Sequence, residues 1–78
     1  MTKEILVLGN SNSKFATTYN NVLEAIKQTG VEATVTKVQD IEGMMKYKVL
    51  TMPVLMIDEK VMVKGRIATL NEIKLFLS

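Results

Sequence analysis

The sequence predicts a small α/β domain with a mixed four-stranded sheet and helices on both of its faces. Residues 4–8 form an almost unbroken apolar run, typical of a strand that is buried on both sides. Apolar residues then recur every three or four positions through residues 15–26, the spacing of an amphipathic helix. A strand-helix-strand start favours a right-handed parallel pair, whereas the later hairpin at residues 54–64 must be antiparallel. Together these patterns indicate a mixed sheet.

The first half of the chain gives three expected elements. Gly9 ends the first strand, and the polar stretch at residues 10–13 offers side-chain oxygens that can cap the following helix. Gly30 ends that helix. Residues 31–36 then alternate between apolar and polar, which predicts an edge strand with one face in water.

The middle of the chain predicts a short helix and a second buried strand. Asp40 can cap a helix over residues 41–45, which Gly43 weakens. Pro53 opens the apolar run at residues 54–57, a place where proline removes no ladder donor.

The C-terminal part predicts a hairpin and a last helix. Asp58-Glu59 is the expected turn, although it lacks the favoured Asn-Gly pair. Residues 60–64 continue as a strand, with Val61 and Val63 expected on one face. Thr69 and Glu72 have the spacing of a capping box, which predicts a helix from there to the C-terminus.

Composition excludes several kinds of chemistry. The 78 residues make one domain, residues 1–78, and contain no cysteine and no histidine. Disulfides, thiol nucleophiles, imidazole bases and the usual zinc sites are therefore excluded. The six methionines suggest a copper(I) site on thioethers, but core filling explains them better, with Met44 and Met56 at apolar positions. We expect no catalytic residue, no metal and no cofactor.

The charges narrow the classes of partner. Ten basic residues against eight acidic ones give a net charge of +2, and the basic residues are scattered, with Arg66 the only arginine. A nucleic-acid surface would need a basic stripe or interleaved aromatics, so no nucleic acid is expected. No apolar run is long enough to span a membrane, and no signal peptide is recognisable, so we expect no membrane partner and a cytoplasmic protein.

Taken in order along the chain, several short segments resemble a known family. They are similar to the small thioredoxin-like proteins called redox-active disulfide protein 2, which are close in size to glutaredoxins. The resemblance covers essentially the whole chain and rests on Val7-Leu8-Gly9, Tyr47, Met52-Pro53-Val54-Leu55 and Lys64-Gly65. It implies a thioredoxin-like fold, the strand order 2-1-3-4 and a cis peptide bond before Pro53.

The chain departs from this family at the redox centre. The family's loop after the first strand reads Gly-x-Gly-Cys-x-x-Cys, and its two cysteines fall on Asn12 and Phe15 here, with the second glycine on Ser11. An amide and a phenyl ring cannot exchange a disulfide, so the missing CxxC removes dithiol chemistry. The family also usually has a small or β-branched polar residue where this chain has Met52.

The site that the resemblance implies is a groove without thiols. Its candidate residues are Ser11, Asn12, Ser13, Phe15, Met52 and Pro53. The polar loop in this groove can serve as a helix cap or as an anion site, and the cap explains it better. Strand-like backbone pairing needs no thiol, so the groove is either a ligand site or vestigial.

Three roles remain open. The preferred one is a non-catalytic module that binds a peptide segment or a small molecule in the groove. The alternative is an enzyme, with glutathione-dependent or thiol-linked redox or transferase activity that uses an external thiol. The third is assembly, because the edge strand at residues 31–36 can pair with a second copy to make a dimer.

Overall fold

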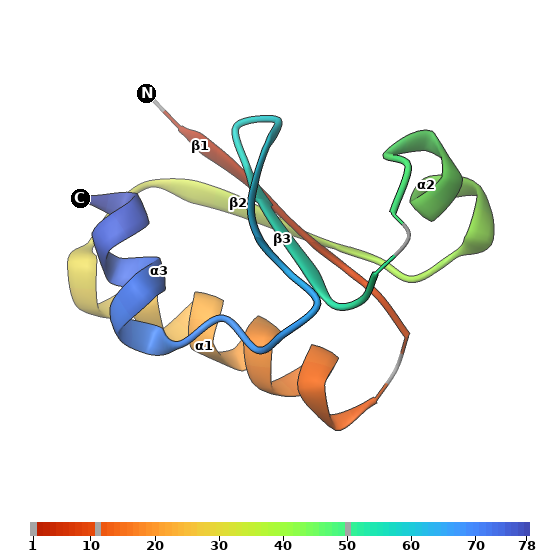
Figure 1. Cartoon of the computed structure of the whole chain (residues 1–78). Helices are drawn as coiled ribbons and strands as arrows, with labels where there is room; N and C mark the ends of the chain where they lie inside the picture. The colour runs from red at the N-terminus through yellow and green to blue at the C-terminus, as the bar shows by residue number, and fades with distance from the viewer. Residues whose placement is uncertain (1, 11, 50) are drawn as a thin grey trace.

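The fold consists of four strands and three helices in alternating order (Figure 1). The computed structural model describes residues 2–10, 12–49 and 51–78. Along the chain its elements are β1 (Lys3–Leu8), α1 (Ser13–Thr29), β2 (Ala33–Val38), α2 (Ile41–Lys46), β3 (Val54–Ile57), β4 (Lys60–Lys64) and α3 (Leu70–Leu77).

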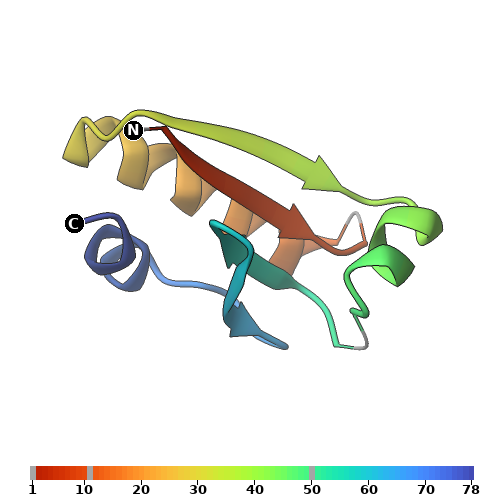
Figure 2. The ribbon, with the colours of Figure 1, turned by 90° about the horizontal axis from the view of Figure 1, so that it is seen from above.

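The four strands form one mixed sheet in the order β2-β1-β3-β4. β1 pairs with β2 in parallel, from Lys3 opposite Ala33 to Leu8 opposite Val38, and pairs with β3 in antiparallel orientation. β4 returns antiparallel to β3. Figure 2 shows this order, with β2 at one edge and β4 at the other. The predicted α/β class and strand order are confirmed.

The main core lies between the sheet and two helices. α1 and α3 pack against each other along one face of the sheet, and α2 lies apart from them (Figure 1). Because β1 and β3 are buried on both faces, every second residue of each enters this core. Its buried members are Ile5, Val7, Phe15, Val22, Ala25, Leu55, Ile57, Val63, Ala68, Ile73 and Leu77.

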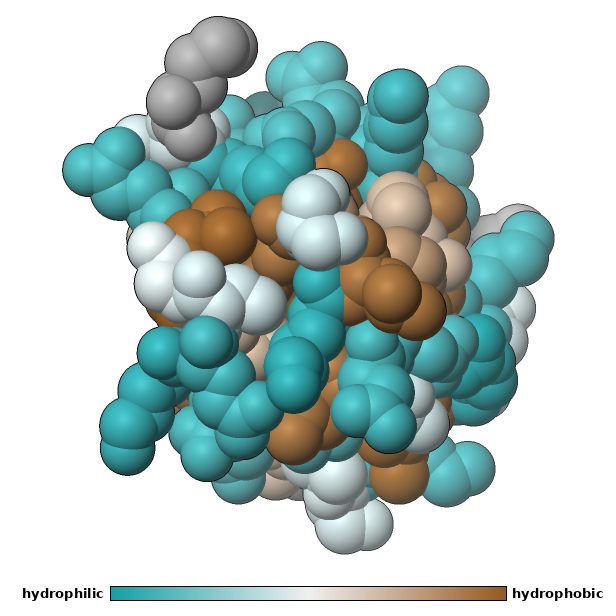
Figure 3. All heavy atoms as spheres, turned by 90° about the vertical axis from the view of Figure 1, so that its left-hand side faces the viewer, coloured by the Kyte–Doolittle hydropathy of each residue, from teal (hydrophilic) through white to brown (hydrophobic). Residues whose placement is uncertain are grey.

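A smaller core lies on the opposite face, under α2. It is built from Leu8, Val38, Val54 and Met56, with Met44 and Tyr47 packed against it. Met44 and Met56 thus fill apolar space, as predicted. Several large apolar side chains stay exposed, and Figure 3 shows hydrophobic atoms scattered among hydrophilic ones at the end that carries both termini. The exposed ones are Leu23, Ile41, Met45, Val61, Met62 and Leu75.

The predicted caps of the two long helices are present. The Asn12 side chain accepts a hydrogen bond from the Phe15 N–H at 2.8 Å and so caps the start of α1. Gly30 ends α1 with a left-handed φ of 70°, and its N–H donates to the Ile26 carbonyl. In α3 both bonds of the capping box between Thr69 and Glu72 are formed.

Two local predictions need correction. The second strand runs over Ala33–Val38 rather than residues 31–36, because pairing with β1 continues until Val38 enters the smaller core. Asp40 stands at the N-cap of α2, but its side chain makes no capping hydrogen bond. Close packing adds a reason for glycine at position 43, because a Cβ there would lie 2.6 Å from the Val38 Cγ1 atom and 2.7 Å from the Asp40 Oδ1 atom.

The hairpin also differs from its prediction. Val61 and Val63 do not share a face, because a register irregularity at Leu55/Met56 places Val63 opposite Leu55 and Val61 opposite Met56. Val63 is therefore buried, whereas Val61 is 54% exposed. The turn residues Asp58 and Glu59 both have positive φ, 51° and 69°, the backbone pattern of a type I′ hairpin turn.

Candidate functional site

The first part of the site is the junction between β1, α1 and the loop before β3. Gly9 follows β1, and its N–H donates to the Val38 carbonyl at 3.0 Å. A Cβ on Gly9 would lie 3.1 Å from the Phe15 Cδ1 atom and 3.5 Å from the Pro53 Cα atom. Glycine at this position therefore allows both residues to pack against the end of β1.

Pro53 is fixed inside this junction. Its side chain is fully buried, and the Met52–Pro53 peptide bond is cis. The Pro53 carbonyl accepts a hydrogen bond from the Gly65 N–H at 2.9 Å, which ties the loop before β3 to the end of β4. Met52 itself is half-buried.

The junction at Gly9 is closed by side chains. The family resemblance places Phe15 at the position of the second cysteine. Only 3% of the surface of Phe15 is exposed. Because Phe15 and Pro53 are both buried against Gly9, the part of the predicted groove between them is filled rather than open. Ser11 lies outside the described residues.

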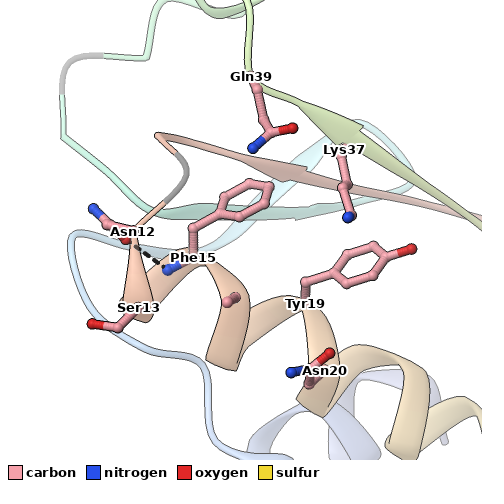
Figure 4. Close-up of a pocket in the computed structure, with 8 residues that line it drawn as sticks. Asn12, Ser13, Phe15, Tyr19, Asn20, Lys37 and Gln39 are labelled. Atoms are coloured by element: carbon pink, nitrogen blue, oxygen red, sulfur yellow. Dashed lines mark hydrogen bonds between the residues drawn. The ribbon is translucent and has the colours of Figure 1, made fainter.

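A cavity opens beside this junction, on the side of α1 that faces β2 (Figure 4). Its volume is about 460 Å³, within the range of small-molecule sites. Of the predicted residues it contains Asn12, Ser13 and Phe15, but neither Met52 nor Pro53. The full lining is Asn12, Ser13, Phe15, Ala16, Tyr19, Asn20, Lys37 and Gln39.

The cavity combines an aromatic wall with polar groups and one cation. The Lys37 ammonium lies 4.4 Å from the centre of the Tyr19 ring, a cation–π contact between β2 and α1. Figure 4 shows Lys37 on β2 and Gln39 just after this strand, above Phe15 and Tyr19 on α1. No carboxylate is among the described residues that line the cavity. A ligand with a carboxylate or other hydrogen-bond acceptors suits this lining.

Five lining residues were not predicted: Ala16, Tyr19, Asn20, Lys37 and Gln39. The spacing of these residues in the sequence indicates in part which of them share a face of a helix or a strand. Tyr19 is four residues after Phe15 and so lies on the same side of the helix. Lys37 and Gln39 follow Val35 at every second position and so share its face of the strand. Only the packing of α1 against β2 brings these two stripes together.

Buried hydrogen bonds hold α1 in place behind the cavity. Thr18 is 1% exposed, and its Oγ1 atom accepts from the Ala68 N–H at 3.3 Å. The Asn21 side-chain amide donates to the Ala68 carbonyl at 2.9 Å. Both polar groups of Ala68 are thus satisfied by α1, which fixes the helix against the segment that leads into α3.

An exposed ion pair stabilises the start of α3. Both terminal nitrogens of Arg66 donate to the Glu72 carboxylate, each at 2.7 Å. The hydrogen bond from Arg66, followed by those from the Thr69 backbone and side chain, lowers the pKa of Glu72 to about 2. The same hydrogen bond raises the pKa of Arg66.

Comparison with known proteins gives a consistent result. Residues 1–78 match the family described as the thioredoxin domain. A protein named thioredoxin from Methanocaldococcus jannaschii is 30% identical over 70 residues, covering 90% of this chain and 80% of that protein. Another thioredoxin, from Methanothermobacter thermautotrophicus, is 31% identical over 58 residues, covering 74% and 75% respectively. In the described ranges, no helix has the length and apolar character needed to cross a membrane.

Proposed function

This chain belongs to the thioredoxin domain family, and on that premise we propose that it is a non-catalytic module that binds a peptide segment or a small ligand beside the N-terminal end of α1. Within the family we place it close to the redox-active disulfide protein 2 group, with Asn12 and Phe15 at the cysteine positions. Without any cysteine the chain cannot carry out dithiol exchange itself. We expect it to act in the cytoplasm.

The observation that carries this proposal is the cavity between α1 and β2. Its lining contains one ammonium group, three side-chain amides and the hydroxyls of Ser13 and Tyr19 beside an aromatic wall, with no carboxylate among the described lining residues. This arrangement favours an acidic ligand: Lys37 attracts the charge, and Asn12 and Asn20 offer hydrogen bonds that fix its orientation. Lys37 has no ion-pair partner among the residues that the structure describes.

Met52 supports the peptide form of this proposal. In the loop before β3, the backbone hydrogen bonds among described residues use the Pro53 carbonyl but neither polar group of Met52. Half-buried and next to a fixed proline, the Met52 backbone is available to pair with an extended segment. Such pairing supplies affinity without a particular side chain, and an acidic side chain in the cavity would add specificity.

The experiment is an NMR titration of the ¹⁵N-labelled protein with a short blocked peptide that carries a glutamate. We expect shift changes at the Asn12 to Asn20 amides, at Lys37 and at Gln39. The same peptide with lysine in place of glutamate should bind at least about tenfold more weakly, a loss of about 1.4 kcal/mol. Unchanged spectra with both peptides would contradict the proposal that this cavity binds a peptide.

Matched variants identify the site. Lys37→Ala removes the cation of the cavity, so we expect the affinity for the glutamate peptide to fall about tenfold. Lys60→Ala removes another exposed lysine, at the start of β4 and outside the cavity, and should leave the affinity unchanged. Equal losses in the two variants would indicate a general charge effect rather than a site.

The enzyme alternative is distinguished by a second probe. Glutathione carries carboxylates and a thiol, so it can bind the cavity and also supply the missing redox group. Binding without turnover in a glutathione-coupled disulfide assay supports the binding module. Turnover that disappears in Lys37→Ala would instead favour the thiol-linked activity.

A further inference from the structure

The two edges of the sheet differ in how well they are protected from pairing with another strand. β4 is interrupted by the register irregularity opposite Leu55/Met56 and begins and ends with lysine, features that discourage edge pairing. β2 keeps an unbroken register with β1 over Ala33–Val38 and contains no proline. The β2 edge is therefore the one that is open to another strand.

Hydrogen bonds at the two ends of β2 show which of its backbone groups are free to pair. The Lys3 N–H donates to the Glu32 carbonyl, and the Gly9 N–H donates to the Val38 carbonyl, both at 3.0 Å. The backbone N–H and C=O groups of the even-numbered residues of β2 therefore point toward β1. Because successive peptide groups of a strand alternate in direction, Ala33, Val35 and Lys37 direct their N–H and C=O groups to the outer edge.

These outward groups match those of a second β2 in antiparallel orientation. When Val35 lies opposite Val35 of a second copy, the two residues exchange both of their hydrogen bonds, and Ala33 lies opposite Lys37 of the second copy in the same way. Thr34 then faces Thr36 of the second copy, a pair that stabilises sheets. No like charges stand directly opposite each other in this register.

The flank of α1 on the same side of the molecule carries an exposed apolar residue. Leu23 is 43% exposed and lies four residues after Tyr19, which contacts Lys37 on β2. Asn21 marks the opposite flank, because its amide donates to the Ala68 carbonyl near α3. Leu23 is therefore on the side of α1 that faces the open β2 edge.

We propose that β2 pairs with β2 of a second copy of this chain, which joins two four-stranded sheets into one continuous sheet of a homodimer. α1 contacts β1 and β2, the two strands nearest this edge. The two α1 helices would then be about two strand spacings, or about 10 Å, apart, close to the 8–10 Å of packed helices. Leu23 of each copy is covered by the other helix.

The proposed dimer contact and the ligand site lie on the same side of α1, the side that faces β2. The pairing uses the backbone of Lys37, while the Lys37 side chain remains on the α1 face beside Tyr19. The dimer is detected by its mass and ligand binding by peptide titration, so each proposal has its own readout.

Sedimentation velocity of the full chain over a concentration series tests the proposal first. We expect the mass to rise with concentration from 8.7 kDa toward twice that value. A protein that stays at 8.7 kDa up to about 1 mM would overturn the dimer, since even weak specific association reaches that range.

A pair of double variants tests the register. Thr34→Lys with Thr36→Lys sets like charges opposite each other across the interface, so dimer affinity should fall about tenfold or more. Thr34→Lys with Thr36→Glu sets opposite charges there and should dimerise at least as tightly as the original chain. Both positions are exposed in the single chain, and circular dichroism checks that each variant is folded. Equal affinities of the two variants would overturn this register.

A matched pair of variants, at Leu23 and Leu75, tests the proposed contact between the two α1 helices. Leu23→Glu places a charge at the proposed α1 contact, so we expect dimer affinity to fall about tenfold. Leu75→Glu introduces the same change on α3, where Leu75 is 73% exposed, and should leave dimer affinity unchanged. Loss of the dimer in Leu75→Glu but not in Leu23→Glu would place the interface elsewhere.

Discussion

The two sides of α1's first turn differ in what they offer a ligand. On one side Phe15 and Pro53 are buried against Gly9, so the position that the family resemblance assigns to a cysteine is part of the core here. On the other side Asn12, Tyr19 and Lys37 line an open cavity. The difference shows that the start of one helix can border both a closed, well-packed junction and an open cavity, and we propose the open cavity as the ligand site.

The largest expected effect comes from reopening the closed side. Phe15→Ala removes a ring that is 3% exposed and leaves a hole beside Gly9 and Pro53. We expect a loss of about 3–5 kcal/mol in the free energy of unfolding, measured by urea denaturation. Because a small domain has only about 5–15 kcal/mol in total, the variant is near its folding limit.

The control for Phe15→Ala is Phe76→Ala, which removes a ring that is only partly buried against the main core. It should be less destabilising, because more of its ring is already in water. A larger loss in Phe76→Ala than in Phe15→Ala would show that the closed side is not the better-packed region.

The second-largest effect concerns the buried hydrogen bond between Thr18 and Ala68, which holds α1 in place. Thr18→Val keeps the shape of a residue that is 1% exposed but leaves the Ala68 N–H without its acceptor. We expect a loss of about 1–3 kcal/mol of unfolding free energy. Thr17→Val makes the same change at an exposed position of the same helix and should stay within about 0.5 kcal/mol. Similar values for the two variants would contradict the role of this buried bond.

A smaller effect is expected at the residue that borders the open side. Asn12→Ala removes the side-chain acceptor of the Phe15 N–H, and helix caps of this kind contribute about 1 kcal/mol. Asn12→Ser keeps an oxygen that can accept the same bond, so it should recover most of the loss in thermal or chemical unfolding. Failure of serine to recover stability would show that the amide acts in some other way.

The smallest effect concerns the exposed ion pair at α3, which is remote from both sides. The pKa of Glu72 falls from 4.5 to about 2 on folding, so its carboxylate stabilises the fold above pH 4.5. This contribution is lost as the pH falls from 4.5 to about 2. Glu72→Gln should therefore flatten the stability profile in that window, measured by thermal unfolding at several pH values. An unchanged slope would contradict the lowered pKa.

Much of the fold follows from local patterns in the sequence. The capping residues Asn12, Thr69 and Glu72 and the terminating Gly30 can be recognised because each acts within one helical turn. The strand order was predicted from the family resemblance and not from local patterns. The exposure of Val61 could not be predicted, because a register irregularity of β4 itself, opposite Leu55/Met56, reverses the face on which Val61 lies.

The site was only partly predictable for a related reason. Asn12, Ser13 and Phe15 follow from their alignment with the family's loop, and they do line the cavity. Tyr19 and Lys37 join them through contacts between a helix and a strand that sequence spacing alone does not specify. Burial of Phe15 and Pro53 likewise depends on their common neighbour, Gly9.

The most direct test of the central claim is the affinity of the glutamate peptide for the original chain and for Lys37→Ala, measured by NMR titration. We predict shift changes that cluster at Asn12 to Asn20, Lys37 and Gln39, and an affinity about tenfold lower in the variant. Shift changes confined to other surfaces, or equal affinities in both proteins, would contradict a ligand site between α1 and β2.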